Sequence, residues 1–332
     1  MKVVITDHRF PDIEPERRAI EAAGGELVVG QAIDEQQVID LCRDADAVLT
    51  GRAPITRRAI EAMQRCRIIV RHGIGVDTVD IPAATERGIM VANVPDYCAD
   101  EVSDHALTLL LMLSRQAISA MALAREDRWL MAKMPRLHRL RDQVLGLFGA
   151  GQIGSLLAPK AAALGMHVVA HDLYLTENRA REIGVESVSL DALLACSDFI
   201  SLHAPLNEHT RHRFGRTAFE KMKRSAFIIN TARGGLIDEA ALVAAIDSGM
   251  ISGAALDVVE SERSVTPVRK ALVSHPKIIV TAHTAWLSEE ARSTLQEHAV
   301  SQVIACLRGE KPYGLINSLP EGAPCIPKHS PV

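Results

Sequence analysis

The sequence contains no long hydrophobic run. Its most apolar stretch, residues 106–114, falls short of the roughly 18 residues that a membrane span needs and has charged residues on both sides. The N-terminal run is short and strand-like and ends in Asp7, which is unlike a secretory signal peptide. We therefore expect no membrane association and no cleaved leader.

Basic residues are not in excess, because 37 Lys and Arg stand against 41 Asp and Glu, for a formal net charge of −4. Without a basic field, the chain lacks the electrostatic footprint of a nucleic-acid-binding protein. Closely spaced cysteine pairs, which mark zinc and redox sites, are also missing. The scattered cysteines predict no metal site and reduced, buried thiols in a cytoplasmic protein. They are Cys42, Cys66, Cys98, Cys196, Cys306 and Cys325.

A chain of 332 residues is long for one hydrophobic core, so two domains are expected. Short apolar runs alternate with helical patterns, which predicts parallel strands and an α/β layer fold. Two longer helices are expected at residues 100–126, a segment apolar enough to be buried, and at residues 289–307, packed on the first domain. The proline-rich residues 312–332 predict a tail or a subunit-contact arm. Strands are expected at residues 3–6, 26–29, 47–50, 68–71, 90–93, 167–171, 199–203, 226–230, 253–258 and 278–281.

The most informative stretch of the sequence is residues 144–154. The apolar residues 144–148 lead directly into a G-x-G-x-x-G pattern and then into helix-forming residues, which is the context of a dinucleotide-binding turn. The first glycine allows the tight turn, the second lets the backbone approach a pyrophosphate, and the third lets the helix pack against the strand. N–H groups at the helix start would bind the phosphates. We assign to this site Gly149, Gly151, Gln152, Ile153 and Gly154.

The next expected strand ends in Asp172, which lies 23 residues after Gly149 (172 minus 149). That spacing is close to the one expected of the carboxylate that binds the adenosine ribose. An anionic Asp172 would accept hydrogen bonds from both ribose hydroxyls and repel a 2′-phosphate, and residues 173–175 contain no Arg or Lys to offset this. The sequence therefore predicts NAD as the cofactor. A chance turn is disfavoured, because strand, glycines, helix, second strand and acid occur in order.

Polar residues follow three later expected strands, at the edge where open α/β sheets bind ligands: Arg233, Glu262 and His283. An arginine can bind a carboxylate bidentately while polarising the adjacent carbonyl, and a histidine beside a glutamate is the general acid–base pattern. The set suits reduction of a 2-keto acid. Each residue alone has an ordinary alternative, a surface ion pair for the arginine or a structural role for the histidine, and spacing does not separate Glu260 from Glu262.

At these residues the sequence resembles a known family. Residues 230–239, 253–258 and 283–286 together look like motifs of the D-isomer-specific 2-hydroxyacid dehydrogenase family, and the resemblance extends over nearly the whole chain. Further motifs look most like its C-terminal binding protein and phosphoglycerate dehydrogenase-like branch: residues 206–209, residues 231–235, and Trp286 three residues after His283.

The resemblance implies that Arg233 binds substrate, that His283 is the acid–base, and that Glu262, the second glutamate of its loop, is the partner of His283. It also implies that backbone amides of residues 71–77 hold the substrate carboxylate. The implied cofactor site also includes His203, Pro205, Thr231, Ala232, Asp257 and His283. The implied substrate-binding residues are Arg71, Gly73, Ile74, Gly75 and Trp286, with Tyr97 and Arg52 as further candidates for the side-chain pocket.

By the same resemblance, a Rossmann-type NAD-binding domain (residues 100–286) is inserted into a flavodoxin-like substrate domain (residues 1–99 and 287–332). The two long helices would carry a hinge across which a cleft closes on substrate. A homodimer through the NAD-binding domain is also implied. One residue departs from the family pattern: Arg263 stands where the family usually has proline, and its charge could compete with His283 for Glu262.

The predicted function is NAD-dependent interconversion of a small 2-keto acid and its D-2-hydroxy acid by hydride transfer. The alternative, raised by the branch resemblance, is an NAD(H)-sensing, corepressor-like scaffold without physiological turnover. Formate oxidation is disfavoured, because formate enzymes of this family have glutamine where Glu262 stands.

Overall fold

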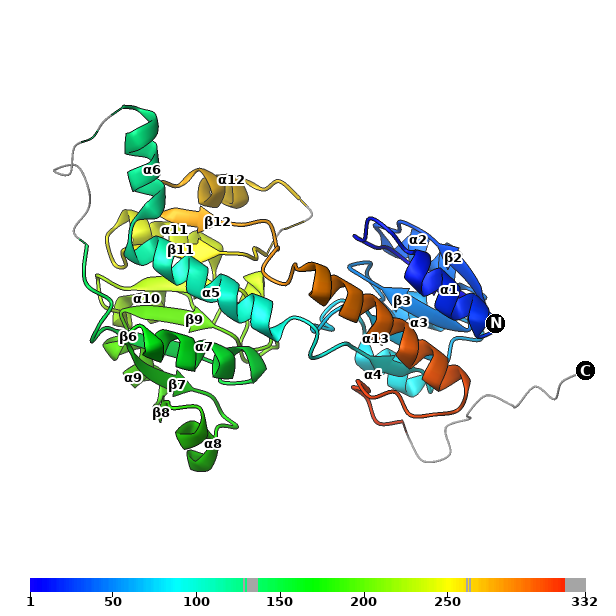
Figure 1. Cartoon of the computed structure of the whole chain (residues 1–332). Helices are drawn as coiled ribbons and strands as arrows, with labels where there is room; N and C mark the ends of the chain where they lie inside the picture. Colours follow the sequence, from blue (N-terminus) through cyan, green and yellow to red (C-terminus); the bar gives the residue numbers. More distant parts are fainter. Residues whose placement is uncertain (128, 130–136, 261, 263, 320–332) are drawn as a thin grey trace, which may run out of the picture. The chain divides into compact units, whose positions relative to one another are not determined.

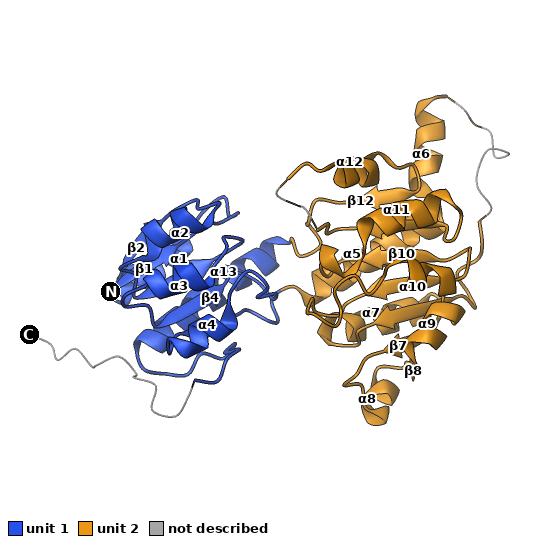
Figure 2. Ribbon diagram, turned by 180° about the vertical axis from the view of Figure 1, so that it is seen from behind, with its two compact units in different colours: residues 1–97, 288–332 blue, residues 98–287 orange. Residues whose placement is uncertain are grey.

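The structure, a computed structural model, describes residues 1–127, 129, 137–260, 262 and 264–319. The chain folds as two compact units, which Figure 2 colours separately. Unit 1 comprises residues 1–97 and 288–332, and unit 2 comprises residues 98–287. The sequence-based limits fall after residues 99 and 286, and those of the structure fall after residues 97 and 287.

Unit 1 is built on a parallel five-stranded sheet in the order β2-β1-β3-β4-β5, which is the flavodoxin-like strand order. The long C-terminal helix α13 (Glu289–Leu307) packs against α1, β3 and β4, as the sequence predicted for this segment. The strands are β1 (Lys2–Ile5), β2 (Glu26–Val29), β3 (Ala47–Thr50), β4 (Ile68–Arg71) and β5 (Met90–Ala92). The other helices are α1 (Glu14–Ala22), α2 (Glu35–Cys42), α3 (Arg57–Ala62) and α4 (Ile81–Glu86) (Figure 1).

Unit 2 is built on a parallel seven-stranded sheet in the order β12-β11-β10-β9-β6-β7-β8. Numbered within the unit, this is the doubly wound Rossmann order with one further strand, so the predicted fold class is confirmed. The strands are β6 (Val144–Phe148), β7 (His167–His171), β8 (Glu186–Ser187), β9 (Phe199–Leu202), β10 (Phe227–Asn230), β11 (Gly253–Leu256) and β12 (Ile278–Val280). The helices are α5 (Ala99–Ser114), α6 (Ala117–Arg125), α7 (Gln152–Ala163), α8 (Glu177–Glu182), α9 (Leu190–Cys196), α10 (Arg216–Lys221), the 3₁₀ turn η2 (Gly234–Leu236), α11 (Glu239–Asp247) and α12 (Pro267–Ser274).

The strands expected from the sequence are confirmed, with ends that shift by at most two residues. They are short apolar runs because parallel strands covered by helices are buried on both faces. In β3 and β11, for example, all four residues are buried. The two-residue strand β8 was missed, because Glu186 and Ser187 are both exposed and carry no apolar signal.

The single long helix expected over residues 100–126 is wrong. The chain forms α5 and α6, which meet at Gln116 in a left-handed conformation (φ 49°) and are bent by 60°. Neither glycine nor proline occurs where the helix breaks, so the residue pattern alone could not predict the break. Helix α5 buries one face against α7, β10 and β11, whereas α6 has no buried residue. No single helix among the described residues is long and apolar enough to cross a membrane, and the pair passes that test only when joined.

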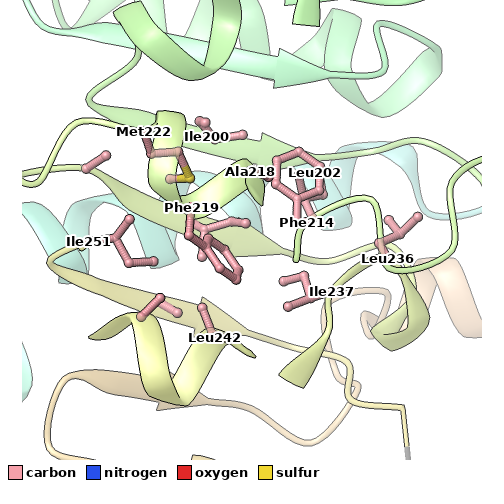
Figure 3. Close-up of a cluster of buried hydrophobic side chains, with 14 of the residues drawn as sticks. Ile200, Leu202, Phe214, Ala218, Phe219, Met222, Leu236, Ile237, Leu242 and Ile251 are labelled. Carbon is pink, nitrogen blue, oxygen red and sulfur yellow. The ribbon is translucent and has the colours of Figure 1, made fainter. Parts of the chain in front are cut away.

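One face of the unit 2 sheet is covered by α10 and α11 through a dense apolar cluster. Figure 3 shows Phe214, Phe219 and Leu202 among the side chains that point toward one another there, and all three are fully buried. Burying side chains of this size contributes about 1.5–3 kcal/mol each relative to exposure. This packing fixes the loops at the carboxyl ends of β9, β10 and β11, which carry the polar residues singled out in the sequence.

The described part of the proline-rich C-terminal stretch is not a free tail. Leu315 forms an antiparallel bridge with Ala92 of β5, and the side chain of Asn317 accepts a hydrogen bond from Val91 N–H (2.7 Å). The segment therefore pairs with the edge strand of the unit 1 sheet, which otherwise would present unpaired backbone groups. Residues 320–332 lie outside the described part of the chain.

The cysteines of the described chain are buried or half-buried thiols. Burial raises the pKa of Cys42 to about 12, so this thiol is neutral and unreactive at pH 7. Cys325 lies outside the described residues. Among those residues, no group of three or more His, Cys, Asp or Glu side chains is arranged to hold a metal ion.

Unit 1 contains a buried carboxyl group on α1. Glu16 is only 1% exposed, accepts a hydrogen bond from Gln296 Nε2 of α13 (2.6 Å), and has a second oxygen, Oε1, that is buried without a hydrogen-bond partner among the described residues. Burial raises the pKa of Glu16 above its ordinary value of 4.5. The charged form is therefore disfavoured in the folded state relative to the unfolded chain.

A Glu16→Gln variant should therefore be more stable than the parent at pH 7 to 8, with a rise in Tm of about 2–4 °C. A raised folded-state pKa contributes stability that is present below pH 4.5 and is lost as pH rises, so the advantage of the variant should vanish towards pH 4.5. Thermal melts from pH 4.5 to 8 test this, with exposed Glu21→Gln on the same helix as the control. A Tm difference independent of pH would contradict the account.

Candidate active site

The glycine turn joins β6 to α7 as the motif requires. Gly149 has a positive φ of 98°, and a Cβ on Gly154 would stand 2.5 Å from the Gly149 carbonyl oxygen. Both positions therefore exclude a side chain for different reasons, conformation and close packing. Around Gly151, which caps α7, no described atom other than those of Gly151 itself and its chain neighbours lies within 4 Å of the point where a Cβ would stand. This leaves space beside Gly151, and the N–H groups of Gln152 and Ile153 open the helix just after it.

Asp172 closes the turn from the end of β7. Its Oδ2 accepts a hydrogen bond from Ala150 N–H (2.8 Å), and its Oδ1 accepts one from Tyr174 N–H (2.8 Å). The carboxylate thus fixes the glycine turn while each oxygen keeps a further lone pair for a ligand. The next two side chains, Leu173 and Tyr174, are 83% and 92% exposed.

Two buried polar atoms lie near the carboxyl ends of β9 and β10. Thr231 Oγ1 and His203 Nδ1 have no hydrogen-bond partner among the described residues. Burial lowers the pKa of His203 to about 4, so the ring is neutral at pH 7, and its Nε2 lies 2.9 Å from Ser201 Oγ. Buried polar atoms normally have a hydrogen-bond partner. A dinucleotide bound in the space beside Gly151 would supply partners for these two atoms. Pro205 and Ala232 belong to the same two loops.

His283 and Glu262 form a pair. The distance from His283 Nδ1 to Glu262 Oε1 is 2.7 Å, and the two side chains are 24% and 22% exposed. The carboxylate holds one ring nitrogen, which leaves Nε2 as the nitrogen that can exchange a proton with a ligand. Because α12 follows this loop, Arg269 also donates from Nη1 to the Glu262 carbonyl (3.1 Å).

Asp257, at the end of β11, holds the loop that carries His283. Its carboxylate is 1% exposed and accepts hydrogen bonds from Thr281 Oγ1 (2.6 Å), Thr284 N–H (2.9 Å) and Ala285 N–H (3.0 Å). His283 N–H donates to the Asp257 carbonyl (2.8 Å). His283 has a positive φ of 56°, a conformation rare for a side-chain-bearing residue, and these contacts hold it there.

Glu260, which spacing could not separate from Glu262, has different partners. Its carboxylate binds Arg211 Nη2 and lies 3.0 Å from His212 Nε2, and its N–H donates to Glu239 Oε1 (2.5 Å). Burial raises the pKa of Glu239. Glu260 therefore ties the loop after β11 to the loops after β9 and β10, while Glu262 alone of the two contacts His283.

Arg233 stands in a turn whose backbone is tightly held. Asn230 Nδ2 donates to the Arg233 carbonyl (2.9 Å), and Asn230 Oδ1 accepts from Ala232 N–H (3.0 Å). A Cβ on Gly234 would collide with the backbone of Val259, so glycine is required where this turn meets the loop after β11. Arg233 Nη1 donates to the Ala232 carbonyl (2.7 Å). Packing thus positions a partly exposed guanidinium on the same sheet edge as the His283–Glu262 pair.

The loop after β4 in unit 1 also requires glycine. Gly73 has a φ of 136°, and a Cβ there would collide with the guanidinium of Arg71. Gly73 N–H donates back to the Arg71 carbonyl (2.9 Å), so this amide is already used. The N–H groups of Ile74 and Gly75 donate to no described residue. Burial, followed by the charge of Arg71, lowers the pKa of the intervening His72 to about 3.

The structure thus brings together, within unit 2, the glycine turn with Asp172 and the set Arg233, Glu262 and His283. Arg71, Gly73, Ile74, Gly75, Arg52 and Tyr97 belong to unit 1. In unit 2, the Trp286 indole N–H donates to the His283 carbonyl (3.1 Å). Arg263 lies outside the described residues.

Sequence reasoning missed several residues that hold the site. Arg211, His212 and Glu239 are ordinary surface-type residues in the sequence, and only the fold brings them to Glu260. His105 of α5 was also missed, although its Nε2 lies 3.2 Å from Thr281 Oγ1 and so supports the Asp257 loop. No local spacing signals such contacts, since 176 positions separate His105 from Thr281.

Residues 107–285 match the model of the D-isomer specific 2-hydroxyacid dehydrogenase, NAD binding domain. A glyoxylate reductase of Korarchaeum cryptofilum is 36% identical over 284 residues, covering 84% of this chain and 85% of the relative. The chain belongs to the D-isomer-specific 2-hydroxyacid dehydrogenase family, as its motifs predicted. Unit 2 contains its NAD-binding domain, and NAD is the cofactor.

Other relatives carry the names of different activities. A D-3-phosphoglycerate dehydrogenase of Methanocaldococcus jannaschii is 35% identical over 319 residues, 96% of this chain, but the chain spans only 59% of its length. A D-lactate dehydrogenase of Aquifex aeolicus, solved with NAD and lactic acid, has a TM-score of 0.86 and 26% identity, covering 93% of this chain and 96% of that one. The shared fold therefore supports several substrates.

Proposed function

We propose that this protein is an NAD-dependent D-2-hydroxyacid dehydrogenase that interconverts a small 2-keto acid and its D-2-hydroxy acid. The observation that carries the proposal is the 2.7 Å contact between His283 Nδ1 and Glu262 Oε1, on the sheet edge that also presents Arg233. A hydrogen-bonded histidine and carboxylate beside an arginine is a set able to bind an acid and move a proton. Family membership supports the same reaction class.

The chemistry that bound NADH supplies is a hydride for C2 of the keto acid. Arg233 binds the substrate carboxylate and polarises the neighbouring carbonyl, because a guanidinium offers parallel N–H donors. His283 donates the proton from Nε2 to the developing alkoxide, and takes it back in the reverse direction. Glu262 accepts the hydrogen bond of Nδ1 and so orients the ring with Nε2 towards the substrate.

In unit 1, the N–H groups of Ile74 and Gly75 bind a carboxylate of the substrate, because adjacent backbone amides form an anion-binding concavity. Thr231 and His203 contact the cofactor through their buried polar atoms. The contact of Asp257 with the nicotinamide, the substrate contacts of Arg71 and Trp286, a homodimer through the NAD-binding domain and a cytoplasmic location stay predictions.

The experiment that tests this function is a panel of 2-keto acids with NADH and NADPH, following the near-ultraviolet absorbance of the reduced nicotinamide. The panel comprises glyoxylate, pyruvate, hydroxypyruvate, oxaloacetate and phenylpyruvate. Oxidation of NADH with at least one acid is expected, and the preferred acid defines the side-chain pocket. No oxidation with any of them would favour the NAD(H)-sensing scaffold instead.

Cofactor choice should depend on Asp172. In an Asp172→Asn variant, the ratio of kcat/KM with NADH to that with NADPH should fall by about tenfold or more, since a like-charge contact with the 2′-phosphate is removed. Steady-state kinetics with both cofactors measure this. The exposed Glu177→Gln change, five residues further on, is the control and should leave the ratio unaltered. An unchanged ratio in Asp172→Asn would show that the selectivity lies elsewhere.

A further inference from the structure

The loop after β4 presents two neighbouring N–H groups whose directions are fixed by a segment distant in sequence. Val94 N–H donates to the Gly73 carbonyl (3.2 Å), which shares a peptide unit with Ile74 N–H. Asn93 Nδ2 donates to the Ile74 carbonyl (2.6 Å), which shares a peptide unit with Gly75 N–H. The carbonyl and N–H of a trans peptide point in opposite directions. Both N–H groups are therefore aimed away from the segment after β5.

The backbone of Asn93 is itself held by two hydrogen bonds. The residue is 7% exposed, its carbonyl accepts from Gln302 Nε2 of α13 (2.8 Å), and its N–H donates to the Gly314 carbonyl (3.0 Å). Gly314 N–H donates in turn to Gln302 Oε1 (2.8 Å), which completes a ring of hydrogen bonds. A Cβ on Gly314 would collide with the Asn93 carbonyl, so the C-terminal segment can come this close to Asn93 only because residue 314 is glycine. The Asn93 side chain therefore has little freedom in where it donates.

We propose that Asn93 is a positioning residue for the substrate carboxylate, and that Gln302 of α13 and Gly314 of the C-terminal segment act through it. Asn93 orients the Gly75 peptide so that Gly75 N–H and Ile74 N–H converge on one anion. The proposal rests on the proposed function, which gives these two amides their ligand. Its new content is that Gln302 and Gly314, which are not among the proposed substrate contacts, affect the affinity for the acid.

Replacing Asn93 by alanine should raise the KM for the keto acid and the Kd for oxamate, an unreactive 2-keto acid analogue, by about tenfold, the equivalent of one hydrogen bond. The amides bind the carboxylate equally in the ground state and the transition state, so kcat should stay within about twofold. The Kd for NADH should also be unchanged. Titration calorimetry with NADH-saturated protein gives the oxamate Kd without any need for turnover.

The matched control is Asn317→Ala. Like Asn93, Asn317 has a buried side-chain amide in unit 1, but it hydrogen-bonds Val91 N–H, the Ile89 carbonyl and Thr85, none of which belongs to the loop after β4. The Asn317→Ala variant should lower Tm, as Asn93→Ala does, but it should leave the oxamate Kd unchanged. If Asn93→Ala weakens oxamate binding no more than Asn317→Ala does, Asn93 is merely structural and the proposal is wrong.

A second variant, Gly314→Ala, displaces Asn93 without replacing it, and it should also raise the oxamate Kd. This variant tests the proposal if Asn93→Ala does not fold. Wild-type protein that binds no oxamate would overturn the inference, because the amides would then hold no carboxylate. Wild-type protein that binds oxamate but reduces no keto acid would contradict the proposed function and leave the inference standing.

Discussion

A His283→Ala variant should lose turnover by about 10³–10⁴-fold in kcat while binding NADH nearly as well as the wild type. The loss is expected because His283 is the only proton donor in the proposed mechanism. The methyl side chain cannot move a proton, and Glu262 loses the ring that it orients at 2.7 Å. The nucleotide contacts assigned to the glycine turn and Asp172 are untouched by the change.

Steady-state reduction of the preferred keto acid gives kcat, and fluorescence titration gives the Kd for NADH. His167→Ala is the control, because His167 is exposed at the amino end of β7, on the sheet edge opposite the site. It should behave as the wild type. Turnover of His283→Ala within tenfold of the wild type would remove His283 from the mechanism.

An Arg233→Lys variant should lose about 10²–10³-fold in kcat/KM for the keto acid although the positive charge is kept. A lysine ammonium is a point charge that cannot make two parallel hydrogen bonds to a carboxylate, and hydrogen bonds to charged groups contribute about 1.5–3 kcal/mol each. Since the Arg233 backbone is held by Asn230, the shorter reach of the ammonium cannot be recovered by movement of the turn.

The same assay with Arg216→Lys serves as the control, because Arg216 is an exposed residue of α10 that pairs with Glu220. That variant should retain wild-type kinetics. If Arg233→Lys keeps more than a tenth of wild-type kcat/KM, the bidentate arrangement is not what binds the acid.

Much of the fold could be predicted, because parallel strands that are buried on both faces appear in the sequence as short apolar runs. Runs such as Ile68–Arg71 and Phe227–Asn230 are short, apolar and followed by helical patterns. The break at Gln116 could not be predicted, since a glutamine in a left-handed conformation has no distinctive local sequence. The pairing of Leu315 with Ala92 was equally invisible, because proline-rich segments carry no strand periodicity.

For the site, residue chemistry at strand ends was enough to select Arg233 and His283, but not to choose between the two glutamates. Glu260 and Glu262 are two positions apart in the sequence, and only the folded structure shows that they contact different loops. Glu260 meets Arg211 and His212, and Glu262 meets His283. Supporting residues such as Asn93 act through backbone carbonyls far away in sequence, so no motif could name them.

The most direct test of the account is the fate of the hydride. Protein incubated with pyruvate or hydroxypyruvate, or with the acid that the panel prefers other than glyoxylate, and with NADH deuterated at both C4 positions should form the 2-hydroxy acid. The account predicts one deuterium at C2 and the D configuration, measured by mass spectrometry and chiral chromatography. A product without deuterium at C2, or of the L configuration, would contradict it.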